Sequence, residues 1–254
     1  MSEMIWHLIK FFNKKQYADD FIKGKLHLKR LGYFRNLESG KSDGRPDANE
    51  ALSHWLQPDG LRIKFSVPGI GETEITHADL AAPVSMSVDY HNHLHIFCLY
   101  AVHTTGFDLT DGKIDCAEDE VTELERQLRI DSRNLEFGEY AVITPAPVFL
   151  DRMKNHLQTR GDYFRGRLVE YYDDKTFNGE IPIREIPFWK QKHFSYQNEF
   201  RICIDSKTAG DNPLNLEIGN ISDICALINS SELNDLLKLQ VSTSDSLGNI
   251  NEDQ

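Results

Sequence analysis

The chain has 254 residues, with 28 basic and 40 acidic side chains, which gives a formal net charge of −12. Its length fits one large domain or two small ones, and its 40% apolar and 27% charged residues are typical of folded proteins rather than disordered ones. The acidic balance argues against non-specific binding along a nucleic-acid backbone, which requires a basic surface.

The sequence also carries signals about location. No apolar run approaches the roughly 20 residues that a membrane-spanning helix needs, and the start, Met1–Met4, lacks the basic residues that open a secretory signal. The four cysteines are widely spaced and form no CxxC pair, which is typical of reduced thiols. We therefore expect a cytoplasmic protein without a membrane partner.

The first third of the chain alternates strands and helices. Residues Trp6–Phe12 predict a strand, and Lys15–Gly24 predicts a helix that ends at its glycine. A second strand follows over Leu26–Leu31. Residues 36–60 are rich in turn formers and predict a long ordered loop or short helices, with Trp55 as an anchor. In Leu61–Val67, apolar and polar residues alternate, which predicts a half-buried strand.

The remaining elements follow the same patterns. Tail residues 243–254 are expected to be flexible and acidic, so that residues 1–242 form a single domain. Because strands outnumber helices without a regular βαβ alternation, we predict an α+β fold of mixed, mostly antiparallel sheets with a few flanking helices. We expect strands at Val84–Val88, Leu94–Val102, Tyr140–Thr144, Leu168–Tyr172, Glu199–Ile204 and Leu214–Ile218, and helices at Glu118–Leu128, Pro145–His156 (with Val148, Phe149, Met153 and Leu157 facing inward) and Ser231–Leu239.

Three histidines, His91, His93 and His95, lie within five residues. On a strand they would face the same side, as the ligands of a zinc or iron hydrolase do. The alternative is a polar turn that leads into the apolar strand at residues 96–100. Because the sequence has neither HExxH nor CxxC, we favour the turn and expect no metal.

A second candidate group is formed by Arg35, Arg45, Asp47 and Glu50. Arginine presents a planar fork that fits phosphate or carboxylate, and a nearby acidic residue can hold that fork in place. The group could bind the pyrophosphate or ribose of a nucleotide. It could equally be an internal network that pins the long loop.

A third candidate is Gln197-Asn198-Glu199, at the start of a predicted strand. Two residues apart, Gln197 and Glu199 would face the same side. A carboxylate there could bind a ribose hydroxyl and stabilise the positive charge of an oxocarbenium-like sugar. The plainer interpretation is a solvated glutamate or a partner for Arg201.

Taken together, Tyr17–Glu50, Val169–Asp173 and Phe194–Ile204 resemble a widespread, uncharacterised bacterial family of domains of unknown function found in genomic defence islands. The layout is also similar to the ADP-ribosyltransferase fold, whose catalytic glutamate opens a late strand as Gln-x-Glu or Glu-x-Glu. This resemblance implies NAD as substrate, with Glu199 and Gln197 catalytic. Its expected NAD contacts are His7, Arg35, Arg45, Asp47, Glu50 and Tyr90, and Ser85, Ser87 and Tyr90 are alternatives for its middle motif.

Two functions follow from these patterns. The first is a toxin or defence effector resembling an ADP-ribosyltransferase, which transfers ADP-ribose from NAD to a macromolecule or to water and which a partner protein or antitoxin neutralises. The second is a non-catalytic, acidic protein that senses a nucleotide or binds a partner in bacterial defence or phage counter-defence. The acidic helix at Glu118–Leu128 favours the second function, because an acidic surface attracts basic partners.

Overall fold

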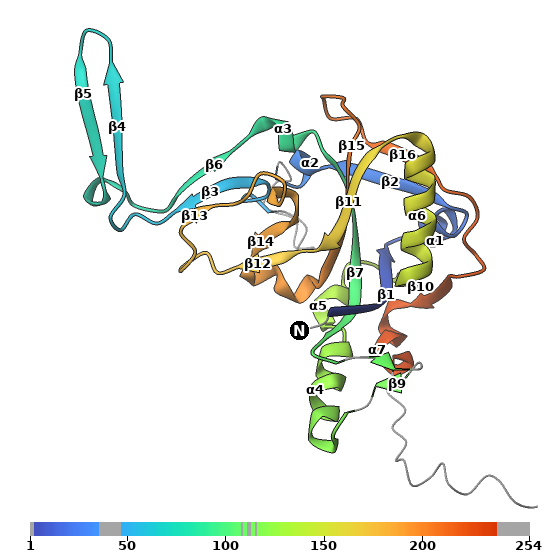
Figure 1. Cartoon of the computed structure of the whole chain (residues 1–254). Helices are drawn as coiled ribbons and strands as arrows, with labels where there is room; N and C mark the ends of the chain where they lie inside the picture. The colour runs from blue at the N-terminus through green and yellow to red at the C-terminus, as the bar shows by residue number, and fades with distance from the viewer. Residues whose placement is uncertain (1–2, 36–46, 108, 111–112, 115, 238–254) are drawn as a thin grey trace, which may run out of the picture.

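The computed structural model describes residues 3–35, 47–107, 109–110, 113–114, 116–237. Its centre is an antiparallel sheet in which the late strand β15 lies between β11 and β7 (Figure 1). The strand order is β11 (Tyr163–Leu168), β15 (Glu199–Asp205), β7 (His95–Thr105), β1 (Glu3–Phe12), β10 (Tyr140–Pro145), β17 (Ala226–Asn229), and β2 (Lys25–Arg30) joins β7 to β16 (Leu214–Glu217).

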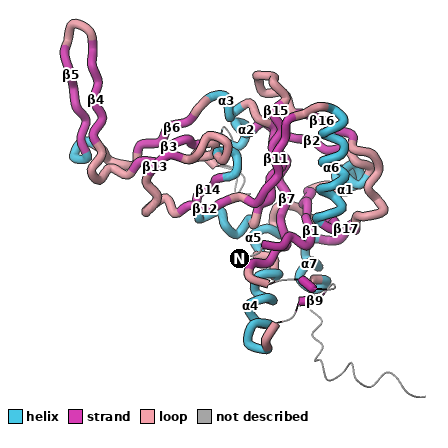
Figure 2. The backbone as a smooth tube through the Cα atoms, in the orientation of Figure 1, coloured by secondary structure: helices cyan, strands magenta, loops and turns pink. Residues whose placement is uncertain are grey.

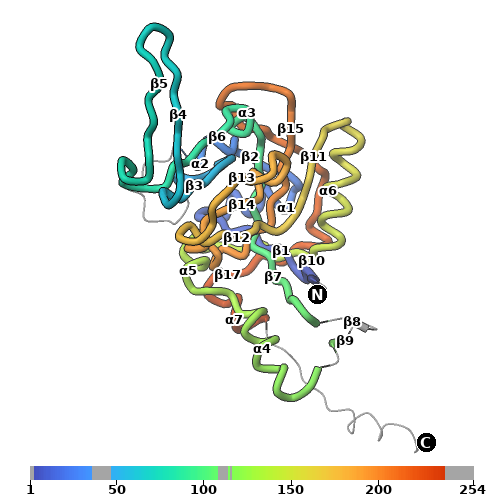
Figure 3. The backbone as a smooth tube through the Cα atoms, turned by 60° about the vertical axis from the view of Figure 1, so that its left-hand side comes forward, coloured from blue at the N-terminus to red at the C-terminus, as the bar shows by residue number. Residues whose placement is uncertain are grey.

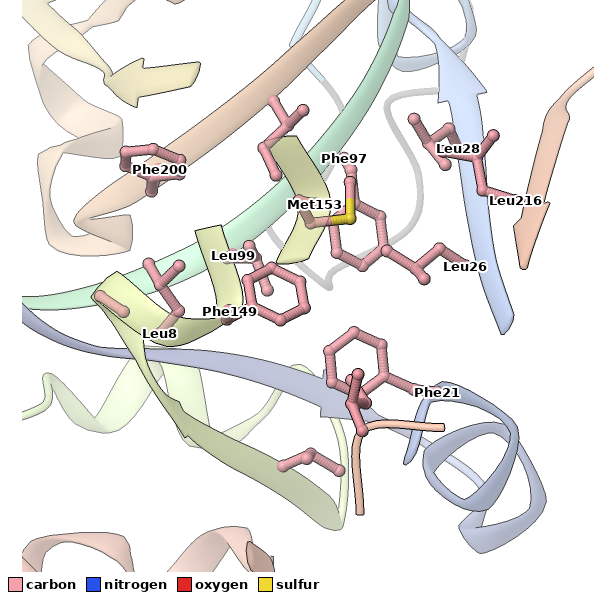
Figure 4. Close-up of a cluster of buried hydrophobic side chains, with 14 of the residues drawn as sticks. Leu8, Phe21, Leu26, Leu28, Phe97, Leu99, Phe149, Met153, Phe200 and Leu216 are labelled. Carbon is pink, nitrogen blue, oxygen red and sulfur yellow. The ribbon is translucent and has the colours of Figure 1, made fainter. Parts of the chain in front are cut away.

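Helices cover one face of this sheet because the strands bury every second residue on that side. Helix α1 (Lys15–Ile22) and helix α6 (Ala146–Arg160) lie there, and Figure 4 shows Phe149 of α6 beside Phe21 of α1, in the cluster that also holds Met153. The Phe21 and Phe149 rings are 5.9 Å apart. This cluster is the largest part of the core.

The opposite face is covered by α4 (Glu118–Leu128), α5 (Ser132–Leu135) and α7 (Leu233–Leu236). Adjacent residues of β1 divide between the two sides: Leu8 packs toward α6, and Ile9 packs into the cluster under α4. A strand buried on both sides explains the nearly continuous apolar run at the start of the sequence.

A second lobe packs against β7 and β15, whose residues Ile96 and Cys203 belong to its core, and it is built of short strands and helices (Figure 2). Its core holds Trp55, Tyr172 and Phe188. The elements of this lobe are α2 (Leu31–Arg35), β3 (Leu52–Leu56), β6 (Val84–Ser87), α3 (Asp89–Asn92), β12 (Glu170–Tyr172), β13 (Gly179–Glu180), η2 (Ile186–Phe188), β14 (Trp189–Gln191) and η3 (Lys192–Gln197).

The remaining short elements lie outside these two groups. A long hairpin formed by β4 (Arg62–Val67) and β5 (Gly71–Thr76) projects from the second lobe and is followed by η1 (His77–Asp79). The strands β8 (Leu109–Thr110) and β9 (Lys113–Ile114) pair with each other, and η4 (Ser230–Glu232) precedes α7.

The predicted α+β class with mostly antiparallel sheets is confirmed, the pair β12–β14 being parallel. The helix predicted at Glu118–Leu128 has those bounds, and Gly24 ends α1 in the left-handed region at φ 83°. No helix in the described ranges has the length and apolarity needed to cross a membrane.

Other local predictions were wrong. Trp55 lies in strand β3, not in a loop, and Leu31 begins α2 instead of ending the second strand. Val148 of α6 faces solvent. Leu239 and the predicted tail at 243–254 lie outside the described residues.

Candidate functional site

Glu199 lies inside a buried cluster of charges. The Arg201 guanidinium donates from Nε to Glu199 Oε1 at 2.6 Å and from Nη1 to Glu50 Oε1 at 2.6 Å. The Lys190 ammonium lies 3.2 Å from Glu199 Oε2 and 3.9 Å from Glu50 Oε2. The cluster therefore pairs two cations with two carboxylates contributed by three separate stretches of the chain.

The charges in this cluster compensate one another. Burial alone would raise the pKa of Glu199, but Arg201 and Lys190 outweigh it and hold that pKa well below its usual range. Burial would likewise lower the pKa of Lys190, and the two glutamates raise it instead. Glu199 and Lys190 are therefore both ionised at neutral pH.

Of the two interpretations of Gln197-Asn198-Glu199, the structure shows the plainer one, in which Glu199 is a partner for Arg201. Glu199 is only 6% exposed, and Gln197, which precedes the strand in η3, accepts a 2.7 Å hydrogen bond from Lys190. A cavity of about 270 Å³ lies nearby, between β12, β14 and the turn after β12, but Glu199 does not line it. Tyr171 connects Glu199 to this cavity: it lines the cavity, and its hydroxyl oxygen accepts a 3.0 Å hydrogen bond from the Glu199 backbone N–H.

The predicted arginine–carboxylate group forms an internal network. Arg35 donates to the backbone oxygen of Glu50 at 2.9 Å and to the Ser87 hydroxyl at 3.1 Å. Glu50 directs its carboxylate to Arg201, and Asp47 is buried beside it. Of the two interpretations of this group, the internal network that pins the loop therefore describes Arg35, Asp47 and Glu50. Arg45 lies outside the described residues.

The histidines do not converge. His91 lies in α3 and bonds through Nε2 to Ile183 O, His93 bonds to Asp89, and His95 begins β7 and bonds to Asn212 O. The favoured interpretation of a polar turn before the strand describes this segment, since α3 ends at Asn92 and β7 begins at His95. Within the described ranges no group of three or more His, Cys, Asp or Glu side chains could hold a metal.

His7 does not meet the other predicted nucleotide contacts. It lies on β1 and is half-buried, which lowers its pKa. It lines neither the cavity between β12 and β14 nor a second cavity beside Tyr90.

That second cavity, of about 300 Å³, opens beyond the charge cluster on the same face of the sheet. Strands β11 and β15 pair so that Tyr163 lies opposite Asp205 and Arg165 opposite Cys203. Because side chains alternate along β15, Cys203 and Asp205 share a face with Arg201. The cavity and the ion cluster are therefore neighbours along one strand.

The cavity combines rings, an apolar floor and positive charge. Tyr90 and Tyr163 are 51% and 58% exposed and stand among its lining residues. Phe188 is buried beneath them, with the Arg165 guanidinium 5.3 Å from its ring centroid. The lining also includes the cations Arg184 and Lys207 and the carboxylate Asp205, which accepts from Tyr90 and Lys207.

Comparison of the chain with protein-family models, curated proteins and solved structures gives no match. The resemblance to the ADP-ribosyltransferase fold therefore rests on its sequence motifs alone.

Of the predicted nucleotide contacts, Tyr90 is the one that lines the larger cavity. Sequence reasoning missed the cations Arg165, Arg184 and Lys207. One signal for the first of these was present: Tyr163-Phe164-Arg165-Gly166-Arg167 places arginines on one side of a short strand. The other two come from a loop and a turn, where periodicity gives no information.

Proposed function

We propose that this protein is a binding protein without chemistry of its own, and that it holds a small anionic ligand of nucleoside-phosphate class in the cavity beside Tyr90. The observation that carries the proposal is the composition of that cavity: exposed rings at its rim, an apolar floor and the cation Arg184 beside the ion pairs Arg165–Glu185 and Lys207–Asp205. Ligand sites typically combine apolar walls with a few polar groups that fix orientation.

The chemistry of each part matches such a ligand. A nucleobase stacks on a tyrosine ring, an interaction worth roughly 1–3 kcal/mol per base. Arginine and lysine bind phosphate oxygens through charge-assisted hydrogen bonds. A volume of about 300 Å³ is at the small end of ligand sites, which favours one nucleotide unit over a dinucleotide such as NAD.

The local positive charge also matters for association. The chain as a whole carries −12, and an anion approaching most of its surface is repelled. In this cavity Arg165 pairs with Glu185 and Lys207 with Asp205, so the charge that offsets the repulsion is that of Arg184. Arg184 is exposed, so its guanidinium is accessible to an incoming phosphate without any rearrangement of the core.

The binding test uses ADP-ribose, ATP and NAD with the wild-type chain, Arg184→Ala and Tyr90→Ala. At a hundredfold excess over Kd, a ligand stabilises the folded state by about 2.7 kcal/mol, which raises Tm by roughly 5–10 °C for a chain of this size. Loss of one phosphate-binding cation is expected to weaken binding about tenfold or more in calorimetry.

Lys154→Ala is the matched control, because Lys154 is an exposed cation on α6, which packs on the other face of the sheet, and is absent from the cavity lining. It should bind as the wild type does. No thermal shift with any of the three compounds, or equal binding by Arg184→Ala and the wild type, would refute the proposed site.

The catalytic alternative, in which Glu199 acts on NAD, makes a different prediction. A carboxylate paired with Arg201 and Lys190 and shielded from solvent has neither access to a substrate sugar nor free charge to stabilise a cation. We expect wild type and Glu199→Gln to show the same background loss of NAD over hours, measured by chromatography.

The control for this measurement is Glu217→Gln, an exposed position on β16, and circular dichroism confirms that each variant is folded. Measurable NAD turnover by wild type that disappears in Glu199→Gln and persists in Glu217→Gln would establish the transferase or glycohydrolase function instead.

A further inference from the structure

The hairpin of β4 and β5 stands away from the rest of the molecule. In Figures 1 and 3 it projects as a two-stranded ribbon beyond the second lobe. Among the described strands, β4 and β5 pair only with each other. Six residues per strand correspond to a ribbon roughly 20 Å long at about 3.3 Å per residue.

Its tip is a tight turn that the sequence specifies. Ile70 donates its backbone N–H to Val67 O at 3.0 Å, which closes the turn around Pro68 and Gly69. Gly69 has φ 82°, the conformation that the third residue of a type II turn requires after proline. The residues of this turn therefore fix the register in which β4 and β5 pair.

The register sorts its side chains onto two faces. Ile63 lies opposite Ile75 and Phe65 opposite Thr73, so one face is apolar and continues to Val67. The other face carries Arg62, Lys64, Glu72 and Glu74, with Arg62 3.5 Å from Glu74. The alternation that predicted a half-buried strand is thus real: Ile63 and Ile75, at the base of the ribbon, are partly buried, whereas Phe65 and Val67, toward the tip, are exposed.

The apolar side chains toward the tip of the ribbon are open to solvent. Phe65 is 46% exposed and Ile70, at the tip, is 81% exposed. None of the apolar residues of the ribbon belongs to the three hydrophobic clusters of the described residues. An isolated two-stranded hairpin is marginally stable in water, and a third strand or a packed face is needed to hold it.

We propose that a second copy of this chain covers the ribbon, the two apolar faces packing against each other across a two-fold axis. The ribbon carries two cations and two carboxylates, so it offers no net charge to an acidic or basic partner. An identical ribbon presents the same apolar stripe, which makes the contact self-complementary.

The charge of the whole chain agrees with contact through the arms. Two bodies of formal charge −12 repel each other, and pairing through projecting, neutral ribbons keeps these bodies apart. The apolar stripe is smaller than the roughly 800 Å² per partner of a standard interface, so the dimer is weak, with a Kd on the order of tens of micromolar.

Sedimentation velocity from about 1 µM to about 200 µM tests the proposal. Wild type is expected to pass from monomer to dimer across that range, and Phe65→Ser to weaken association at least tenfold. Raising salt from about 0.05 M to about 0.5 M should strengthen the wild-type dimer, because it screens repulsion between the bodies. An interface held by ion pairs would respond in the opposite direction.

Lys64→Ser is the matched control, since it makes a polar substitution at the adjacent position of β4, on the opposite face. It should dimerise like wild type. A wild-type chain that stays monomeric at every concentration, even if the ribbon then binds a different protein, overturns the proposal. Equal effects of Phe65→Ser and Lys64→Ser, or a dimer that survives Phe65→Ser unchanged, overturn it as well.

Discussion

Replacing Arg201 with methionine is expected to lower the free energy of unfolding by about 3–5 kcal/mol. Arg201 is fully buried and donates to both Glu50 and Glu199, with a further 2.7 Å bond from Nη1 to Pro187 O. Without it, two buried carboxylates face the single charge of Lys190. An uncompensated buried charge costs far more than a lost surface pair, because no water replaces the missing partner.

Urea titration followed by tryptophan fluorescence measures the effect. Arg126→Met is the control, because Arg126 pairs with Glu123 at 2.6 Å on the exposed surface of α4 and its loss should leave the midpoint unchanged. The double variant Arg201→Met/Glu50→Gln removes the stranded carboxylate and should lose less stability than the two single losses combined. A loss below about 1 kcal/mol for Arg201→Met would mean that the cluster is solvated like a surface pair.

The sequence predicts elements well where periodicity is complete. Strand β15 begins at Glu199 and helix α4 spans Glu118–Leu128 as expected, because alternation or helical spacing continues over the whole element. Strand β3 was missed because its five residues follow a run of turn formers, and local composition outweighed a short apolar pattern. A short strand is specified by its neighbours β6 and β13, which sequence periodicity does not identify.

The site was less predictable, for a physical reason. The motif Gln197-x-Glu199 correctly placed two polar side chains close together, since both contact Lys190. What sets their chemistry is burial, the approach of Lys190 from the short strand β14, and the approach of Glu50 from a distant segment, and all three depend on tertiary packing. The same motif in an open cleft would carry a free carboxylate, whereas in this fold it carries one that is neutralised.

The ribbon of β4 and β5 shows a different limit of prediction from sequence. Alternation in β4 was recognised, and half burial was inferred from it, yet the face lies exposed in the monomer. Alternating apolar residues predict that one face of a strand is buried, but they do not predict whether the same chain or another chain buries it. A sequence pattern therefore remains informative when the folded chain does not satisfy it, because the unsatisfied face identifies an interaction surface.

Asp47→Asn is expected to stabilise the protein at pH 8 by about 2–3 kcal/mol and to remove a pH dependence between about pH 4 and pH 6. Burial, with repulsion from Glu50, raises the pKa of Asp47 to about 6, while Lys190, the Asn49 backbone N–H and Arg201 act against the rise. Its Oδ2 has no hydrogen-bond partner within the described ranges, so the ionised form is poorly solvated there.

The direction of this pH dependence follows from the pKa of Asp47 in the folded and unfolded states. In the unfolded chain the Asp47 carboxyl has a pKa of about 3.9, so the folded state binds its proton more tightly. Asp47 therefore stabilises the fold below about pH 3.9, and this stabilisation is lost as the pH rises through about 6. Glu199 acts oppositely: its lowered pKa supplies stability above its unfolded value of about 4.3, and acid removes it.

Urea unfolding of wild type and Asp47→Asn at several pH values between about 4 and 8 measures this difference. Burial lowers the pKa of His91 and His95, which costs stability as pH falls, but both histidines are present in the two proteins and cancel in the comparison. Asparagine keeps an oxygen for the Asn49 backbone N–H, which Asp47 Oδ1 accepts at 2.9 Å. If the two curves run parallel across this range, Asp47 does not titrate there, and a compensating charge must hold it ionised in the folded protein.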